Sequence, residues 1–202
     1  FNMEDCNTSS TPANTTVKLS KRLEALTTQA KELMGTRPYR ALVGALLSLI
    51  LTRPDIAVAV NECCSYLSSP GQAMWTAAKR VLRYLKGTMN HCLHLQAKAK
   101  THGSNTECYV DSSHADDRDT RRSRCGWLLY HNYNLIGWKT TMQKRVALST
   151  AEAEYRAATL AGKEIAWLRG LLLELGQVQT TPTPMYEDNR ACILMVENPI
   201  VS

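Results

Sequence analysis

Residues 147–176, ALSTAEAEYRAATLAGKEIAWLRGLLLELG, predict the helix on which the fold depends. Ser149 is a favourable N-cap, and Glu152 three residues later completes the pattern of a capping box, pointing back toward Ser149. Gly176 can adopt the left-handed conformation that ends a helix. Between these ends, apolar residues recur at three- and four-residue spacing and predict one buried face. That face comprises Ala157, Leu160, Ala161, Ile165, Leu168, Leu172 and Leu175.

Glu154 interrupts this pattern with a charge. It lies one turn before Ala157 and therefore begins the same apolar face. Glu152 has a structural role in the helix cap, whereas Glu154 has none. Burying a carboxylate beside an apolar face costs free energy unless a cation or a hydrogen-bond donor meets it. Glu154 therefore predicts a metal site to which other carboxylates contribute.

Two further carboxylates end predicted strands. Asp111 ends the strand at residues 107–111, and Asp188 ends the strand at residues 185–188. If the long helix returns the chain so that these strands are parallel, their carboxyl ends meet at one edge of a sheet. Taken singly, Asp188 also fits an N-cap and Asp111 the first residue of a turn. Three acids at one edge repel each other unless cations hold them, which favours the metal site.

The order of the predicted elements indicates an α/β fold with a mixed sheet and flanking helices. Residues 125–131 and 135–140 form a hairpin after the first strand, and a short helix follows Asp188. Upstream, three helical segments are followed by a short alternating strand at residues 91–95. The predicted organisation is a linker and weakly helical lead-in over residues 1–36, a small helical module over residues 37–96 and the α/β domain over residues 106–202.

Composition bounds the functional class. The chain has 202 residues, of which 44% are hydrophobic and 21% charged, as in ordinary globular domains. A net charge of +6 and a pI near 9.0 favour a polyanionic partner. Seven cysteines without CxxC spacing indicate reduced thiols in an intracellular protein that is not secreted. No apolar run is long enough to predict a membrane span, and the first residue, Phe1, suggests a piece of a longer chain.

Several motifs resemble a known family. YVDSS at residues 109–113, VALSTAEAEY at residues 146–155 and YEDN at residues 186–189 resemble the ribonuclease H domain of Ty1/copia-type retrotransposon polyproteins. Residues 1–21, 38–60 and 75–88 resemble the segment that joins reverse transcriptase to that domain. The resemblance implies a ribonuclease H-like mixed sheet with flanking helices, preceded by a helical module similar to a reverse transcriptase thumb or connection.

The resemblance also implies a chemistry. The family's catalytic and metal-binding acids fall on Asp111, Glu154 and Asp188, with two Mg²⁺ ions, or Mn²⁺ in their place, as cofactors. The implied reaction is cleavage of the RNA strand of an RNA·DNA hybrid, and the implied protein partner is the remainder of the Pol polyprotein, with no membrane involved. The family's fourth acidic position lies beyond Ser202, so the domain is expected to be C-terminally incomplete. Phosphate contacts are expected from Arg121, Arg122, Arg124, Lys139, Lys144, Arg145, Lys79 and Arg83.

Two alternatives stay open on the sequence alone. A catalytically inactive remnant of a decayed element would keep its nucleic-acid binding, and a purely structural connection domain would have neither property. The basic residues of the third helical segment, at residues 72–86, also allow two interpretations. Lys79, Arg83 and Lys86 recur on one side, which is slightly more typical of a solvated face than of a surface that contacts nucleic acid.

Overall fold

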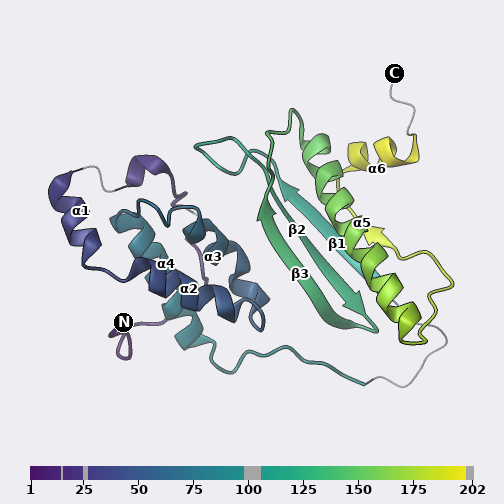
Figure 1. The fold of residues 1–202 in the computed structure, drawn as a ribbon, viewed down its shortest axis with the longest axis horizontal. Coiled ribbons are helices and arrows are strands. Elements are labelled where there is room, and N and C mark those ends of the chain that lie inside the picture. The colour runs from purple at the N-terminus through teal and green to yellow at the C-terminus, as the bar shows by residue number, and fades with distance from the viewer. Residues whose placement is uncertain (15, 25–26, 98–105, 199–202) are drawn as a thin grey trace. The chain divides into compact units, whose positions relative to one another are not determined.

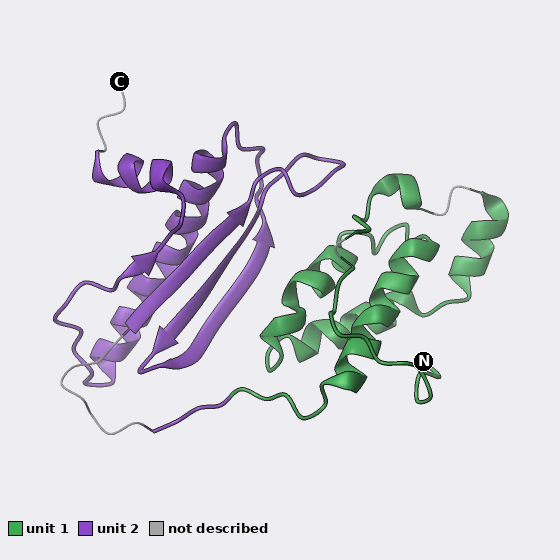
Figure 2. Ribbon diagram, turned by 180° about the vertical axis from the view of Figure 1, so that it is seen from behind, with its two compact units in different colours: residues 1–93 green, residues 94–202 purple. Residues whose placement is uncertain are grey.

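The chain folds into two compact units. The computed structural model describes residues 1–14, 16–24, 27–97 and 106–198, and it divides the chain into Phe1–Leu93 and His94–Ser202 (Figures 1 and 2). The first unit is helical and the second contains the sheet. None of the helices in the described residues is both long enough and apolar enough to cross a membrane.

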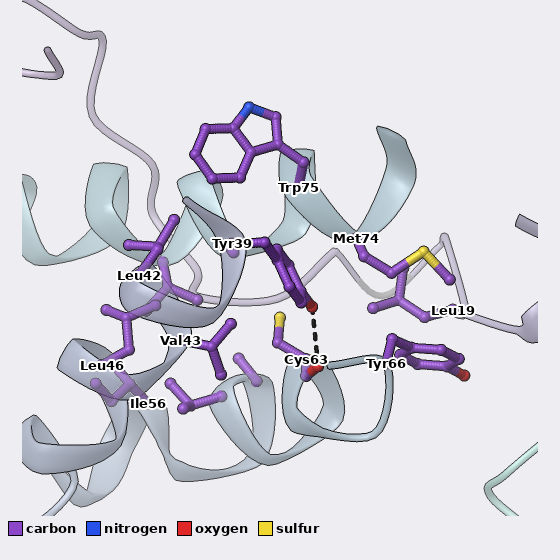
Figure 3. Packing of buried hydrophobic residues seen from close by; sticks show 14 of the residues in the cluster. Leu19, Tyr39, Leu42, Val43, Leu46, Ile56, Cys63, Tyr66, Met74 and Trp75 are labelled. Atoms are coloured by element: carbon purple, nitrogen blue, oxygen red, sulfur yellow. Dashed lines mark hydrogen bonds between the residues drawn. The ribbon is translucent and has the colours of Figure 1, made fainter. Parts of the chain in front are cut away.

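In the described residues, the first unit has six helical segments around one apolar core. These are η1 (Lys21–Leu23), α1 (Thr28–Gly35), α2 (Tyr39–Leu49), η2 (Pro54–Ile56), α3 (Ala57–Cys64) and α4 (Gln72–Gly87). The Tyr39 hydroxyl donates a hydrogen bond of 2.8 Å to the carbonyl oxygen of Cys63 inside this core (Figure 3). Leu19 and Met34 are buried in the same core. The described part of residues 1–36 therefore contributes buried side chains to the helical unit, which a linker would not. Its helical segments η1 and α1 fit the predicted helical lead-in.

The N-terminal segment lies along α4. Three cationic side chains of that helix donate hydrogen bonds to main-chain carbonyl oxygens of the segment, so part of the predicted basic stripe is engaged within the unit. The pairs are Arg80 with Thr11 at 3.2 Å, Arg83 with Asn7 at 2.7 Å and Lys86 with Cys6 at 2.9 Å. A segment without regular secondary structure is thereby held in place, because long basic side chains satisfy its carbonyl groups.

The second unit is a mixed sheet covered on one face by a long helix. Its elements are β1 (Thr106–Ser113), β2 (Arg124–His131), β3 (Asn134–Met142), α5 (Thr150–Glu174), β4 (Met185–Tyr186) and α6 (Arg190–Glu197). The strand order is β3-β2-β1-β4, in which β1 and β2 are antiparallel, β2 and β3 are antiparallel, and β1 and β4 are parallel. The α/β class with a ribonuclease H-like mixed sheet is confirmed.

One predicted strand does not form. Residues 91–97 have neither helix nor strand structure. Alternation alone does not make a strand, because a strand needs a neighbour to pair its backbone groups. In this stretch, Gln96 instead exchanges two hydrogen bonds with the Asn134 side chain, donating at 2.7 Å and accepting at 3.1 Å.

Helix α5 packs through small side chains. Its buried residues are Ala153, Glu154, Ala157, Ala161, Leu168 and Leu172. They form one core with residues of β1 and β2, including Cys108, Val110 and Leu129. Two residues of the predicted face lie outside it, since Leu160 is 37% exposed and Leu175 is 66% exposed. Leu160 lies about 100° around the helix from Ala161, and Leu175 is the C-cap residue.

Candidate metal centre

Three carboxylates from separate elements converge at one edge of the sheet. Each of Asp111, Glu154 and Asp188 offers an oxygen, and these oxygens all lie within 4.8 Å of one another. The strand register explains the pairing of the two aspartates, because Tyr109 pairs with Tyr186 in the parallel ladder. Asp111 lies inside β1 and Asp188 lies just after β4. Each is two residues beyond that pair, so the two aspartates take equivalent places on neighbouring segments of the chain.

Glu154 is buried at this edge. Its side chain comes from the start of α5 and is 5% exposed. Its Oε2 atom has no hydrogen-bond partner among the described residues. Burial, followed by repulsion from Glu187, Asp111 and Asp188, raises the pKa of Glu154 to about 8, while a backbone hydrogen bond from Ser112 lowers it. The metal-free protein therefore holds a carboxyl group for which it supplies too few compensating contacts.

These residues fit a magnesium or manganese ion. Mg²⁺ binds oxygen ligands at about 2.0–2.1 Å, so two ligands on opposite sides of one ion are about 4.2 Å apart. The 4.8 Å limit on the three oxygens is close to that span. The unpartnered Oε2 of Glu154 is the type of buried acceptor that a bound cation would satisfy.

The helix cap separates the roles of the two glutamates. The Ser149 hydroxyl accepts a hydrogen bond of 3.1 Å from the Glu152 amide. The Glu152 carboxylate accepts one of 2.6 Å from the Leu148 amide, one residue before the position expected of a capping box, and it pairs with Arg156 at 2.5 Å. Glu152 thus turns back to the helix end while Glu154 faces the aspartates, as the sequence predicted.

The alternative roles of the two aspartates do not apply. The N-cap of α6 is Asn189, whose side chain accepts a hydrogen bond of 3.0 Å from the Cys192 amide. Asp188, which immediately precedes it, is exposed. Asp111 lies inside β1 opposite Gly126 and not at the first position of a turn. Asp188 is therefore not the N-cap of α6, and Asp111 does not begin a turn, although the sequence also allowed these two roles.

Sequence reasoning missed two residues that shape this centre. Gln143 is buried and donates hydrogen bonds to the Ala153 carbonyl at 2.9 Å and to the Ser112 hydroxyl at 3.5 Å, which joins α5 to β1 beside Glu154. In the sequence it stands in a basic loop, where an exposed polar residue is expected. Glu187 is a fourth carboxylate next to the centre. The available signal was its place beside Asp188 at the end of a strand.

The predicted phosphate contacts fall into different environments. Four of them are exposed side chains of the second unit, namely Arg121, Arg122, Lys144 and Arg145. Two others have carboxylate partners, since Arg124 is buried and pairs with Asp116 at 3.1 Å and the exposed Lys139 lies 3.7 Å from Glu164. Lys79 and Arg83 belong to the first unit, where Lys79 lies over the Trp75 ring and Arg83 holds the N-terminal segment.

The fold and the three acids define a ribonuclease H-like domain with a candidate carboxylate metal centre. Comparison with known proteins gives the family, and the chain belongs to the retrovirus-related Pol polyproteins of copia-type transposons. It is 40% identical, over 98% of its length, to the retrovirus-related Pol polyprotein from transposon TNT 1-94 of Nicotiana tabacum. It is 38% identical, over 80% of its length, to the corresponding polyprotein from transposon RE2 of Arabidopsis thaliana.

The chain corresponds to a small part of these relatives. It spans 15% of the tobacco polyprotein and 11% of the Arabidopsis polyprotein. Another relative, named secreted RxLR effector protein 161 of Plasmopara viticola, is 40% identical over 67% of this chain, and the match covers 94% of that protein. No family model and no solved structure matches the chain.

Proposed function

We propose that the second unit is a ribonuclease H-type endonuclease that cleaves the RNA strand of RNA·DNA hybrids during retrotransposon reverse transcription. The observation that carries the proposal is the convergence of Asp111, Glu154 and Asp188, whose oxygens lie within 4.8 Å of one another. Membership in the family of retrovirus-related Pol polyproteins supports it, because the chain's motifs resemble the ribonuclease H domain of such polyproteins. The remainder of the polyprotein is the proposed protein partner.

Each residue has a role that follows from its position. Bound Mg²⁺ or Mn²⁺ ions would activate a water and stabilise the leaving oxygen of an in-line displacement at phosphorus. Asp111 on β1, Glu154 on α5 and Asp188 after β4 would hold the ions, because their oxygens meet at one edge of the sheet. The buried position of Glu154 fixes its carboxylate relative to the strands.

The exposed basic side chains would bind the nucleic-acid backbone. Contacts from Arg121, Arg122, Lys144 and Arg145 to phosphates fix the register of a duplex without reading its bases. Discrimination of the RNA strand would depend on duplex shape and on the 2′-hydroxyl groups. We therefore expect cleavage that depends weakly on base sequence.

A cleavage assay tests the proposal. The substrate is an RNA·DNA hybrid labelled on either strand, incubated with Mg²⁺ and either the 202-residue chain or the polyprotein that contains it. We expect cuts in the RNA strand, their loss in Asp111→Asn, and normal cleavage by Glu152→Gln, whose site is the helix cap.

Three outcomes would overturn the proposal. Salt-sensitive hybrid binding without cleavage by either protein would identify a non-catalytic nucleic-acid-binding domain. The absence of both binding and cleavage would identify a structural connection domain. Cleavage that persists in Asp111→Asn at the wild-type rate would show that this centre does not perform the reaction.

A further inference from the structure

The second half of α5 carries an exposed apolar surface. On its other side the helix contacts β1 and β2 (Figure 1). Trp167 is 64% exposed, and Leu160 and Leu171 are each 37% exposed. Contiguous apolar surface marks sites of protein contact, and tryptophan is enriched at such contacts because it combines a large ring with little conformational freedom. These residues therefore indicate a docking surface on the side of α5 that faces away from the sheet.

The spacing of the residues places them on one line along the helix. Successive residues of this line alternate between steps of three and four positions, and all of them are exposed. They define the outer face of α5: Leu160, Lys163, Trp167, Gly170 and Glu174. At about 100° per residue, this alternation keeps the residues on one side of a helix, and it is the spacing at which two helices pair along their length. The outer face is about 21 Å long.

The outer face has a projecting side chain next to a recess. Gly170 follows Trp167 by almost one turn and has no side chain. A Cβ atom added to Gly170 would meet nothing within 4 Å outside the backbone of α5, so the packing of this unit does not require a glycine there. Glycine weakens the interior of a helix. The open surface at Gly170 is, however, the type of place that the ring of a tryptophan from a facing helix can fill.

The charges of the outer face fit the same face in reverse. Lys163 lies four residues before Trp167, and Glu174 lies four residues after Gly170. None of the ion pairs found in the described part of the chain includes Lys163 or Glu174. If Trp167 lies opposite Gly170 of an antiparallel copy, equal steps in opposite directions bring Lys163 opposite Glu174. A parallel copy would instead place each charge against itself, and like charges across a contact repel each other.

We propose that the outer face of α5 binds the outer face of a second copy of this chain in an antiparallel, two-fold symmetric dimer. Trp167 of each copy packs on Gly170 of the other, and Lys163 of each copy pairs with Glu174 of the other. A two-fold symmetric contact uses one patch on both copies, so the patch must complement itself. The outer face does so in shape and in charge. Because this contact is short, we expect a reversible dimer.

The dimer leaves the carboxylate centre accessible. Glu154 lies about 20 Å along α5 from Trp167 and about 140° around the helix. The inference therefore does not depend on the proposed function, and the two can fail separately.

Sedimentation of the full chain over a range of concentrations tests the inference. We expect a monomer–dimer equilibrium in the wild type. Trp167→Ala should raise the dissociation constant at least about tenfold, because truncation of a central tryptophan is among the most costly changes at an interface. The matched control is Leu173→Ala, which removes a 60% exposed apolar side chain of α5. Leu173 lies about 120° around the helix from Trp167, so this variant should dimerise like the wild type.

Filling the recess gives a second variant that preserves the monomer. Gly170→Gln places a side chain with a good helix propensity at an open position, so circular dichroism should show unchanged or higher helix content. The same side chain occupies the place of Trp167 from the other copy, so the dimer should weaken.

Exchange of the two charges tests the antiparallel arrangement. Lys163→Glu and Glu174→Lys each place like charges opposite one another, so each variant alone should dimerise more weakly than the wild type. A mixture of the two variants, one of them carrying a fluorescent label, should form a heterodimer because opposite charges face each other again at both ends. The double variant with both substitutions should recover the dimer for the same reason.

Three results would overturn the inference. A wild-type chain that sediments as a monomer at every concentration would leave the outer face to another segment of the polyprotein. A dissociation constant unchanged by Trp167→Ala would place the dimer contact elsewhere. A mixture of Lys163→Glu and Glu174→Lys that associates no better than either variant alone would exclude the antiparallel arrangement. Sedimentation does not measure cleavage, so the absence of hybrid cleavage would count only against the proposed function.

Discussion

Replacing Glu154 with glutamine should stabilise the metal-free second unit at neutral and alkaline pH. The pKa of Glu154 is raised from 4.5 to about 8, first by burial and then by the neighbouring carboxylates. When folding raises the pKa of an acid, the contribution of that acid to the free energy of unfolding depends on pH. The contribution is fully present below the pKa of the acid in the unfolded chain, and it is lost as the pH rises through the pKa in the folded protein. The wild type should therefore lose stability between about pH 4.5 and pH 8, and Glu154→Gln should not lose this contribution.

The size of the effect follows from the interval between the two pKa values. Each pKa unit corresponds to about 1.4 kcal/mol. At pH 7 the unfolded carboxyl is ionised while the folded one, with a pKa of about 8, is mostly protonated, which costs the wild type about 3 kcal/mol relative to acid pH. Glutamine has the same shape and no charge, so the variant should gain most of this difference at pH 7.

Hydrogen exchange can measure this change in stability for the second structural unit alone. Exchange of amides in β1 and α5 reports the free energy of opening the second unit separately from the first. The difference between the two proteins should grow by about 3 kcal/mol from pH 4.5 to pH 7, and saturating Mg²⁺ should stabilise the wild type and leave Glu154→Gln unchanged. Parallel pH profiles for the two proteins would refute the assignment of Glu154 as a buried, repelled carboxylate.

Three further changes have defined outcomes. Glu152→Ala should destabilise the start of α5 by about 0.5–2 kcal/mol, measured by hydrogen exchange of the amides in its first turn. Glu152→Gln should keep the contact with the Leu148 amide, so equal losses of stability in both variants would contradict the cap assignment. Lys144→Ala combined with Arg145→Ala should weaken hybrid binding and lower its salt dependence. Each phosphate contact contributes about 0.9 to the slope of the logarithm of affinity against the logarithm of salt concentration. An unchanged slope in filter-binding assays would show that these two residues do not contact phosphates. Arg83→Ala removes the donor to the Asn7 carbonyl, so limited proteolysis should cut the N-terminal segment sooner than in wild type, and identical cleavage rates would show that this contact does not hold it.

The arrangement of the three acids was predictable because it depends on local signals. A cap at Ser149 fixes where α5 begins, and the misplaced charge at Glu154 marks the face on which a polar partner is required. The sequence places Asp111 and Asp188 near the carboxyl ends of β1 and β4. These strands are parallel, so both residues lie at one edge of the sheet. Periodicity and chain order carry all of this information, so one sequence was sufficient.

Other features depend on contacts between distant residues and carry no local signal. The polar N-terminal segment reads as a linker, yet the side chains of Arg80 and Arg83 hold it from more than 60 residues away. Gln143 stands among basic loop residues, and its burial depends on the approach of α5 to β1. Glu187 is adjacent to a predicted ligand, but only the tertiary structure shows that one of its oxygens is buried without a partner.

The position of the centre finally depends on residues with no chemistry of their own. Ala153, Ala157 and Ala161 are all buried where α5 meets the sheet. Side chains this small let a helix approach β1 closely, since larger ones would hold the layers apart in a close-packed interior. The carboxylate of Glu154, the residue after Ala153, then reaches the carboxyl ends of the strands. The cap at Ser149 fixes where α5 begins and therefore where Glu154 lies along the strands. The helix cap, the alanine face and the parallel register of Tyr109 with Tyr186 are independent constraints. Loss of any one would separate the acids without changing an acidic residue, so the arrangement of the carboxylates is a property of the whole α/β unit.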